Sequence, residues 1–410
     1  MNIHLVCTGT ELLTGHTLNT NQQFIGGCLE AAGYRLAAER CVPDTGAAIA
    51  AAVREELARA DVVITIGGLG PTSDDLTRDS VACELGVRLK FNADVHAAIT
   101  AYLAGRNVAV PAESLRVQAM VPENATPLLN RNGTAPGLWC PASNGKVVIL
   151  LPGPPRELQP MFQEQVLPRL RELAPPEVAR VAFSVCGLPE SAVAEVVERE
   201  LAAFAGIEPA YCARPAQVEV RLSATPALKE RLDMARARLT ECLGDTVLPA
   251  GCSEPAQAVG AMLLEQHLWV ATAESCTGGW IAKTLTDLPG ASAWFSGGLV
   301  TYSNDWKECL LDVPEAILND YGAVSAETVT AMLEALFRRY EADAGIAVTG
   351  IAGPAGGTAD KPVGLVYIAT GLRAQRQVTR HLFPGNRDSV RQRAVTTALN
   401  QLRLQLLQFQ

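Results

Sequence analysis

One short segment of the sequence combines hydroxyl and thiol side chains with two glycines, Thr272-Ala-Glu-Ser-Cys-Thr-Gly-Gly279. It lies between an apolar run, 267–273, and a helical pattern, 280–288. A strand that enters a helix through such a turn leaves backbone N–H groups free to bind a developing negative charge. Ser275 or Cys276 is therefore a candidate nucleophile. The alternatives are a helix-capping hydroxyl for Ser275 and a small buried side chain for Cys276.

A serine nucleophile needs a base, because a hydroxyl is a weak nucleophile at neutral pH. The five histidines occur in no recognisable triad context, so a lysine is the better candidate. Lys307 lies in a turn flanked by Tyr302 and Trp306, where partial desolvation would lower its pKa toward neutrality. Lys283, two turns into the helix that follows Ser275, is the reserve candidate and otherwise a surface residue.

Further polar turns follow other expected strands in the same part of the chain, at 301–307 and at 348–354. Arg387 and Arg391 are four residues apart at the start of the last helix and so share a helical face. Two guanidinium groups near a helix N-terminus can clamp a phosphate. The alternative is a solvated face on which they pair with Asp388.

A glycine-rich turn also follows an expected strand near the N-terminus, Gly67-Gly-Leu-Gly-Pro-Thr-Ser-Asp-Asp-Leu-Thr77. Glycines let a backbone approach a phosphate closely, and Asp74 and Asp75 could hold a divalent cation beside it. The alternative is that both carboxylates cap a helix. Glu11 and Asp44 end other expected strands, and such ends converge on one edge of a parallel sheet.

Composition limits the classes of protein that fit. The chain has 410 residues, 48% of them hydrophobic and 19% charged, with a formal net charge of −9. The negative charge argues against broad nucleic-acid binding, which needs a basic face. We expect a cytoplasmic protein without a signal peptide or a membrane span. The eleven cysteines include no C-x-x-C pair, which favours reduced thiols over a disulfide framework or a zinc site.

The elements that must position these residues alternate between apolar runs and amphipathic helices, which is typical of α/β domains with parallel sheets. We expect two parallel-sheet α/β domains, 1–168 and 254–410, joined by a small α+β module, 169–250, that serves as a spacer or forms a homodimer. The expected strands are 3–8, 61–66, 146–151, 178–185, 217–223 and 298–300, and the expected helices are 21–32, 47–60, 190–204 and 227–243.

Several of these strings resemble the CinA family over nearly the whole chain. The segment 272–279 is similar to the nicotinamide-nucleotide amidase domain of that family, as are Tyr302-Ser-Asn304, Gly350-Ile-Ala-Gly-Pro354 and Phe383-Pro-Gly385. The matching strings in the N-terminal half are Gly9-Thr-Glu11, Gly67-Gly-Leu-Gly-Pro-Thr72 with Asp74, Asp75 and Thr77, Gly133-Thr-Ala-Pro-Gly137 and Leu151-Pro-Gly-Pro-Pro155.

The resemblance implies that the C-terminal domain hydrolyses the carboxamide of nicotinamide mononucleotide, without a metal or other cofactor. It makes Ser275 the nucleophile, Lys307 the base and Tyr302 a supporting hydroxyl, with an oxyanion site at the amides of Thr277, Gly278 and Gly279. The implied substrate contacts are Asn304, Thr349, Gly350, Gly353, Arg387 and Arg391.

For the N-terminal half the resemblance implies a molybdopterin-binding type of fold and metal-dependent cleavage of the pyrophosphate of ADP-ribose. Asp44, Asp74 and Asp75 are then the candidate metal ligands, and Asp75 is also a candidate catalytic residue. The implied substrate contacts are Glu11, Asn19, Gly67, Gly68, Gly70, Pro71, Thr72 and Thr77. The alternatives are a molybdopterin-binding protein or transferase, and a non-enzymatic partner in DNA uptake or repair.

Overall fold

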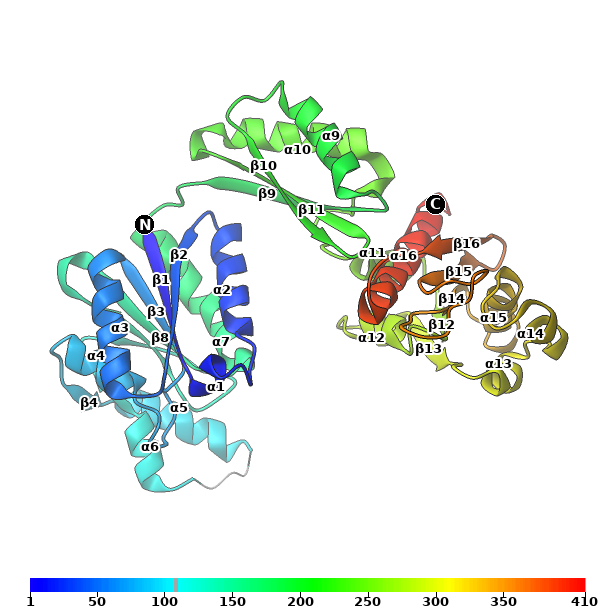
Figure 1. Ribbon diagram of the computed structural model, residues 1–410. Helices are drawn as coiled ribbons and strands as arrows, with labels where there is room; N and C mark the ends of the chain where they lie inside the picture. Colours follow the sequence, from blue (N-terminus) through cyan, green and yellow to red (C-terminus); the bar gives the residue numbers. More distant parts are fainter. Residues whose placement is uncertain (107–109, 410) are drawn as a thin grey trace. The chain divides into compact units, whose positions relative to one another are not determined.

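The computed structural model describes residues 1–106 and 110–409, which divide into two compact units. The first contains Met1–Arg180 and Ala224–Lys229, and the second contains Val181–Ser223 and Glu230–Gln410. Both units combine sheets with flanking helices (Figure 1). The expected boundary at 168 falls inside helix α8 (Leu167–Leu173).

The first unit is built on a six-stranded sheet in the order β2-β1-β3-β8-β7-β6. Strands β2, β1, β3 and β8 run parallel, whereas β7 and β6 pair antiparallel at one edge, so the sheet is mixed. The central strands β3 and β8 are buried along their whole length because helices cover both faces. The strand bounds are β1 (Asn2–Thr8), β2 (Arg35–Val42), β3 (Val62–Ile66), β6 (Thr126–Leu128), β7 (Gly137–Pro141) and β8 (Val147–Leu151).

Two apolar cores cover the two faces of this sheet. One contains side chains of α2, α7 and α8, and the other contains side chains of α3, α4 and α5. A separate antiparallel pair joins β4 (Leu89–Phe91) to β5 (Met120–Pro122). The helix bounds are α1 (Thr10–Leu13), α2 (Thr20–Ala31), α3 (Gly46–Arg59), α4 (Thr77–Glu84), α5 (Ala93–Ala104), α6 (Ala112–Gln118) and α7 (Pro155–Met161).

The second unit contains a five-stranded sheet in the order β13-β12-β14-β15-β16. Strands β13 and β14 flank β12 in parallel, and β15 and β16 continue the sheet antiparallel. The carboxyl ends of β13, β12 and β14 therefore meet at one edge, where ligands bind in open α/β sheets. The strand bounds are β12 (Val270–Glu274), β13 (Phe295–Val300), β14 (Ala344–Gly350), β15 (Leu365–Leu372) and β16 (Arg376–Leu382).

Helices cover both faces of this sheet as well. Helices α11, α12 and α16 share one core with it, and α13, α14 and α15 share the other. The helix bounds are α11 (Pro255–Glu265), α12 (Trp280–Thr286), α13 (Asn304–Leu311), α14 (Glu315–Tyr321), α15 (Ala326–Arg339) and α16 (Arg387–Gln408).

A three-stranded sheet in the order β10-β11-β9 also lies in the second unit, apart from the first two residues of β9 and the last residue of β11. Its strands are β9 (Ala179–Cys186), β10 (Glu208–Arg214) and β11 (Gln217–Ala224), and its helices are α9 (Glu190–Leu201) and α10 (Lys229–Leu243). The buried guanidinium of Arg403 on α16 donates to the carbonyl oxygens of Asp245 and Val247 just beyond α10. These bonds tie the segment after α10 to the last helix.

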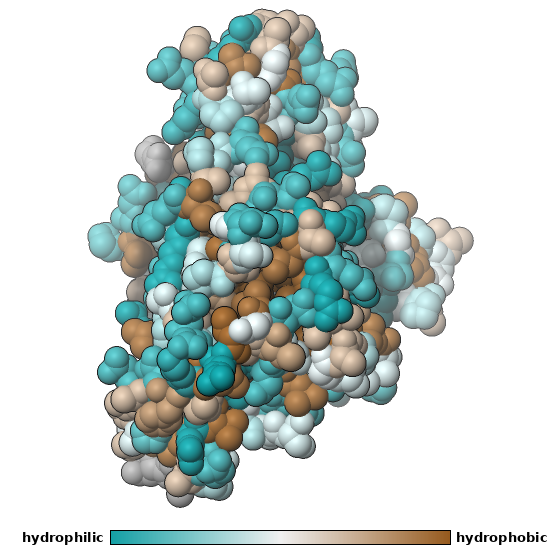
Figure 2. Space-filling model, turned by 90° about the vertical axis from the view of Figure 1, so that its left-hand side faces the viewer, coloured by the Kyte–Doolittle hydropathy of each residue, from teal (hydrophilic) through white to brown (hydrophobic). Residues whose placement is uncertain are grey.

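The α/β class expected from the sequence is confirmed, with antiparallel edge strands as the added detail. The strands expected at 3–8, 61–66 and 146–151, and the helices expected at 21–32 and 47–60, agree with β1, β3, β8, α2 and α3 to within one residue at each end. Hydrophilic and hydrophobic side chains are interspersed over the face shown in Figure 2. Within the described ranges, no helix has the length and apolar character needed to cross a membrane.

Candidate active site

The turn from Ser275 to Gly279 follows β12 near the middle of the five-stranded sheet and leads directly into α12. Ser275 is nine-tenths buried and Thr277 is fully buried. Gly278 and Gly279 have φ values of 62° and 89°, a left-handed conformation that favours glycine. The two glycines thus let the chain reverse sharply and begin the helix.

Lys307 reaches this turn from the neighbouring strand end. Strand β13 stops at Val300, and Ser303 caps α13 by accepting a hydrogen bond from the amide of Trp306. Lys307 is 1% exposed, and its Nζ lies 3.3 Å from Ser275 Oγ, 2.9 Å from the Thr301 carbonyl and 3.5 Å from the Tyr302 carbonyl. The expected pairing of Ser275 with Lys307 is therefore present in the structure.

The partners of Lys307 also define the direction of proton transfer. A carbonyl oxygen can only accept, so the N–H groups of Lys307 must point at Thr301 and Tyr302. A neutral amine then has its lone pair left for the hydroxyl hydrogen of Ser275. Burial lowers the pKa of Lys307, and Lys307 forms no salt bridge within the described part of the chain. Both features favour the neutral amine, which is the form a base requires.

The backbone amides of the turn divide into two groups. Gly278 N donates to Ser275 O at 3.1 Å, so this amide is engaged within the turn. The amides of Thr277 and Gly279 have no hydrogen-bond partner among the described residues, whereas the amide of Cys276 faces its own thiol. Of the oxyanion site expected at Thr277 to Gly279, Thr277 and Gly279 therefore remain as candidate donors.

Glu274, which we did not single out in the sequence, holds the start of α12. Its fully buried carboxylate accepts from the amides of Ile281 at 3.0 Å and Ala282 at 2.8 Å, and Thr272 Oγ1 lies 3.4 Å away. A carboxylate at a helix N-terminus satisfies orphan amides and favours the helix dipole. The only available signal in the sequence was an acidic residue in an otherwise uncharged strand.

Arg387 and Arg391 bind the turns rather than Asp388. Arg387 donates to the Gly353 carbonyl at 2.8 Å and to Tyr302 Oη at 3.0 Å. Arg391 donates to the carbonyl oxygens of Cys276 at 3.1 Å and Thr277 at 2.8 Å. The two arginines therefore join three polar turns that the sequence placed at separate strand ends.

The remaining expected contacts differ in their surroundings. Thr349 is fully buried at the end of β14, and its hydroxyl donates to the Ala323 carbonyl at 2.6 Å. Gly350 ends the same strand, where a Cβ would lie 2.8 Å from the Leu365 carbonyl oxygen. Asn304 is exposed as the first residue of α13. Thr349 thus shapes the turn, whereas Asn304 is accessible from solvent.

The structure also separates the alternatives that the sequence left open. Burial raises the pKa of the Cys276 thiol to about 12, so a thiolate nucleophile is disfavoured there. Lys283 is two-thirds exposed and its Nζ bonds Asp287 Oδ2 at 2.5 Å. Of the two candidate bases, Lys283 is therefore the surface residue.

A second candidate site is a cavity of about 400 Å³ in the first unit. It lies at the carboxyl ends of β1, β3 and β8, and polar side chains and loop glycines form much of its wall. Of the residues predicted from the sequence, its lining includes Glu11, Asp44, Gly67, Gly68, Gly70, Pro71, Asp74 and Asp75.

Three other predicted residues lie outside the lining. Asn19 caps α2 and its Nδ2 donates to Glu39 Oε1 at 2.8 Å. Thr77 is fully buried, 3.4 Å from the hydroxyl of Thr8. The hydroxyl of Thr72 lies within hydrogen-bond distance of the carboxylates of both Asp74 and Asp75. Its bond to Asp74 lowers the pKa of that carboxyl. The predicted substrate contacts at Asn19, Thr72 and Thr77 are therefore absent from the cavity wall.

Several residues of the cavity wall were not named as site residues in the sequence analysis. Glu157 on α7 is more than nine-tenths buried and accepts from Asn130 Nδ2 at 2.7 Å. Gln118, also buried, donates to Thr134 Oγ1 at 3.0 Å. Thr134 and the loop before α7 lie within quoted motifs, but no sequence pattern linked Gln118 or Glu157 to them.

The carboxylates of this cavity suit an oxygen-preferring cation. Glu11, Asp44, Asp74, Asp75 and Glu157 all line it. Asp44, Asp74 and Asp75 do not form a group whose oxygens all lie within 4.8 Å, as judged over the described residues. Magnesium-like ions are commonly held by one or two carboxylates together with substrate phosphates, which this arrangement allows.

Comparisons with known proteins match both halves of the chain. Residues 253–406 match a family model described as the CinA C-terminal domain, and residues 4–172 match one described as a probable molybdopterin binding domain. A CinA-like protein of Akkermansia muciniphila is 45% identical over 97% of this chain and 96% of its own length. A CinA-like protein of Desulfovibrio desulfuricans is 40% identical over 98% and 96%.

Solved structures match shorter parts of the chain. A competence/damage inducible protein of Agrobacterium tumefaciens is 41% identical, covers 37% of this chain and 93% of that chain, and has a TM-score of 0.36.

Proposed function

The chain belongs to the CinA family, and from this premise we propose that its C-terminal domain hydrolyses nicotinamide mononucleotide to nicotinate mononucleotide and ammonia. The observation that carries the proposal is the distance of 3.3 Å between Lys307 Nζ and Ser275 Oγ in a buried site. A serine hydroxyl can act as a nucleophile when a buried lysine beside it serves as its base. The reaction would contribute to pyridine nucleotide recycling.

In the proposed reaction Lys307 carries one proton in each of two steps, first from Ser275 to ammonia and then from water back to Ser275. Lys307 takes the hydroxyl proton as Ser275 Oγ bonds the carboxamide carbon, and the carbonyl oxygen becomes an oxyanion. The free amides of Thr277 and Gly279 are the candidate donors to that oxyanion. Collapse breaks the C–N bond, and Lys307 returns its proton to the departing ammonia. Water then cleaves the acyl-enzyme with Lys307 again acting as base, which regenerates Ser275 and releases the carboxylate.

The arginines support a nucleotide as substrate. Arg387 and Arg391 bring two guanidinium groups to the sheet edge that holds the serine. Guanidinium groups bind phosphate through paired hydrogen bonds, and each uses only part of its five donors on the protein. Exposed Tyr302 adds a hydroxyl beside Arg387.

For the N-terminal domain we propose metal-assisted cleavage of the pyrophosphate of ADP-ribose. Its support is the cavity in which a glycine-rich loop and five carboxylates face the same space. One or two of the carboxylates of Asp44, Asp74 and Asp75 would hold a divalent cation together with the substrate phosphates, whose charge the cation would neutralise. The amides of Gly68, Leu69 and Gly70 would bind phosphate oxygens, whereas that of Gly67 donates to the Leu151 carbonyl.

Ammonia release from nicotinamide mononucleotide by the purified full-length protein tests the first proposal. Wild type is expected to release ammonia, with or without a chelator, and Ser275→Ala is expected to release none while keeping the wild-type circular dichroism spectrum. Cys276→Ala serves as the matched control and should remain active. Loss of activity in Cys276→Ala with retention in Ser275→Ala would transfer the nucleophile to the thiol. A folded but inactive wild type would favour the non-enzymatic partner role.

Incubation with ADP-ribose, with and without added Mg²⁺ or Mn²⁺, tests the second proposal. Metal-dependent formation of AMP and ribose phosphate is expected. Retention of a pterin by the protein without turnover of ADP-ribose would instead favour the molybdopterin-binding alternative.

A further inference from the structure

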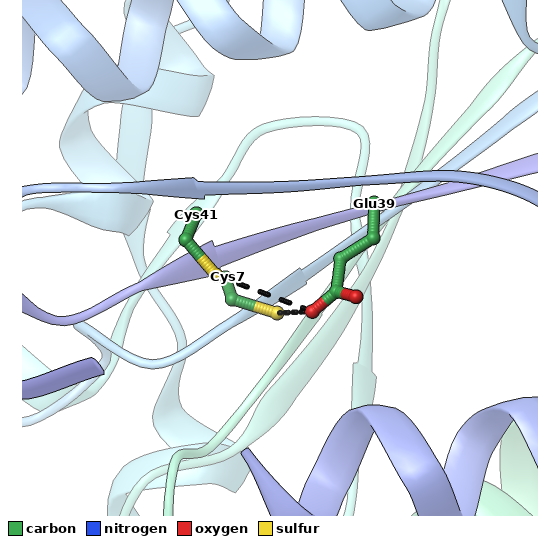
Figure 3. A group of neighbouring side chains, drawn as sticks. All are labelled: Cys7, Glu39 and Cys41. Carbon is green, nitrogen blue, oxygen red and sulfur yellow. Dashed lines mark hydrogen bonds between the residues drawn. The ribbon is translucent and has the colours of Figure 1, made fainter. Parts of the chain in front are cut away.

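Three side chains outside both candidate sites converge in the first unit: Cys7, Glu39 and Cys41 (Figure 3). Their ligand atoms, two sulfurs and one carboxylate oxygen, all lie within 4.8 Å of one another. None of the three lines the cavity described above. Neither proposed reaction uses them, so their convergence needs its own account.

The sheet register brings these residues together although they are far apart in the sequence. Cys7 on β1 pairs with Cys41 on the parallel strand β2. Glu39 precedes Cys41 by two residues, and side chains two apart on a strand point to the same face. That face carries the core shared by β1 and α2. The group therefore follows from the pleat and register of two regular strands.

Internal hydrogen bonding does not explain the group well. The Sγ atoms of Cys7 and Cys41 lie 3.8 Å and 4.0 Å from Glu39 Oε1, at the weak end for a thiol donor. Around a tetrahedral zinc ion, a sulfur at about 2.3 Å and a carboxylate oxygen at about 2.1 Å from the metal lie about 3.6 Å from each other. The two observed sulfur-to-oxygen distances are only slightly longer than that value, so small side-chain rotations would suffice for coordination.

We propose that Cys7, Glu39 and Cys41 bind a thiophilic divalent cation such as zinc. Two thiolates and one carboxylate are a ligand set for soft or borderline ions, in contrast to the cavity, whose candidate metal ligands are all carboxylates. Binding releases the two thiol protons to solvent and leaves a net charge of −1 on the complex. The fourth position remains for water or an external ligand, as in zinc sites with three protein ligands.

The surroundings suit such a site. Cys7 is buried, Cys41 is half-buried and Glu39 is exposed, so an ion can enter from the solvent side of Glu39 and reach the deeper sulfur. Asn19 Nδ2 donates to Cys7 Sγ at 3.2 Å and to Glu39 Oε1 at 2.8 Å, which orients two ligands and supports negative charge on both.

Cobalt substitution tests this proposal directly. The full-length protein is reduced, stripped of metal with a chelator and titrated with Co²⁺ under a non-thiol reductant. We expect a near-ultraviolet sulfur-to-cobalt charge-transfer band that saturates at a single equivalent per chain and disappears when Zn²⁺ is added. Cys41→Ser and Glu39→Gln should each weaken binding by more than about tenfold, which is the least that loss of even an outer-shell partner costs.

Cys83→Ser is the matched control, because Cys83 is exposed and belongs to no such group within the described residues. It should bind cobalt like the wild type. A band that survives in Cys41→Ser, or that is lost equally in Cys83→Ser, would overturn the proposal. So would a folded wild type that takes up no cobalt while peroxide joins Cys7 to Cys41, since that outcome assigns the pair to a disulfide.

Discussion

At the scale of single residues, Lys307 combines the features of a base with a cost in stability. It is almost completely buried, and desolvation lowers its pKa. The rate of ammonia release should therefore rise with pH and level off above the folded-state pKa of Lys307, which lies below 10.5. A rate that is independent of pH over the stable range of the protein would contradict this role.

Two lysines of the domain form a matched pair for mutation. Lys307→Met should lower the rate of ammonia release by about a thousandfold, because general base catalysis contributes on this order. Lys283→Met should leave the rate unchanged, because Lys283 is exposed and pairs with Asp287. Steady-state ammonia assays of both variants provide the measurement. An equal loss of ammonia release in the two variants would contradict the assignment of Lys307 as the base.

The same substitution predicts an effect on stability. The folded-state pKa of Lys307 lies below that of an unfolded lysine, so the unfolded chain binds more protons and stability rises with pH between the two values. At neutral pH burial of Lys307 costs stability, because the amine must either keep its charge in a buried position or give up the proton that it holds in the unfolded chain. Lys307→Met removes that cost. Urea unfolding should show the variant as stable as wild type or more so. Marked destabilisation would mean that the bonds to Thr301 and Tyr302 dominate.

Arg391 positions the nucleophile turn and is also a candidate substrate contact. Its bonds to the carbonyls of Cys276 and Thr277 hold the turn that carries the nucleophile. Arg391→Ala should therefore lower kcat by about a hundredfold as well as raise KM, because small misplacements of reacting groups are costly. Separate kcat and KM values decide the matter. A change in KM alone would restrict Arg391 to phosphate binding.

At the scale of elements, Glu274 connects the central strand to the helix behind the nucleophile. Removing its carboxylate takes away the side-chain acceptor of the amides of buried Ile281 and half-buried Ala282. We expect Glu274→Ala to reduce the free energy of unfolding by about 1–3 kcal/mol and to lower ammonia release. Denaturant titration and the ammonia assay provide the two measurements. Loss of activity without loss of stability would point to a direct role in catalysis instead.

The sequence predicts elements well where a regular pattern specifies them. The buried run of β3 and the amphipathic helices α2 and α3 were located to within one residue. Lys307, the predicted base, does lie beside Ser275, because the parallel strands β12 and β13 end at the same edge of the sheet. The convergence of parallel strand ends concerns backbone topology, which hydrophobic periodicity encodes.

Side-chain direction and strand register are not encoded in such patterns. Asn19 was expected at the substrate and instead caps α2 beside Glu39. Gln118 and Glu157 reach the cavity from α6 and α7, which no spacing rule relates to the glycine-rich loop. The meeting of Cys7 with Cys41 depends on the pairing of β1 with β2, so the lack of a C-x-x-C pair excluded only chelation by near neighbours.

At the scale of the whole molecule, the two candidate sites lie in different compact units. Each unit has its own sheet between two apolar cores, and the residues of each site come from one unit alone. A sheet with its own core on both faces does not need the other unit to hold its turns in place. The two proposed reactions should therefore be separable by point mutation within the intact chain.

Asp75→Asn tests that independence. The carboxylate of Asp75 lines the first cavity and accepts from the amide of Thr72 at 2.9 Å, and an amide side chain preserves its shape while losing the charge that a cation needs. We expect this variant to lose cleavage of ADP-ribose and to release ammonia from nicotinamide mononucleotide at the wild-type rate. Ser275→Ala should show the reverse. Loss of both activities from Asp75→Asn, in a chain whose unfolding curve matches wild type, would mean that the units are energetically coupled and that neither site can be treated alone.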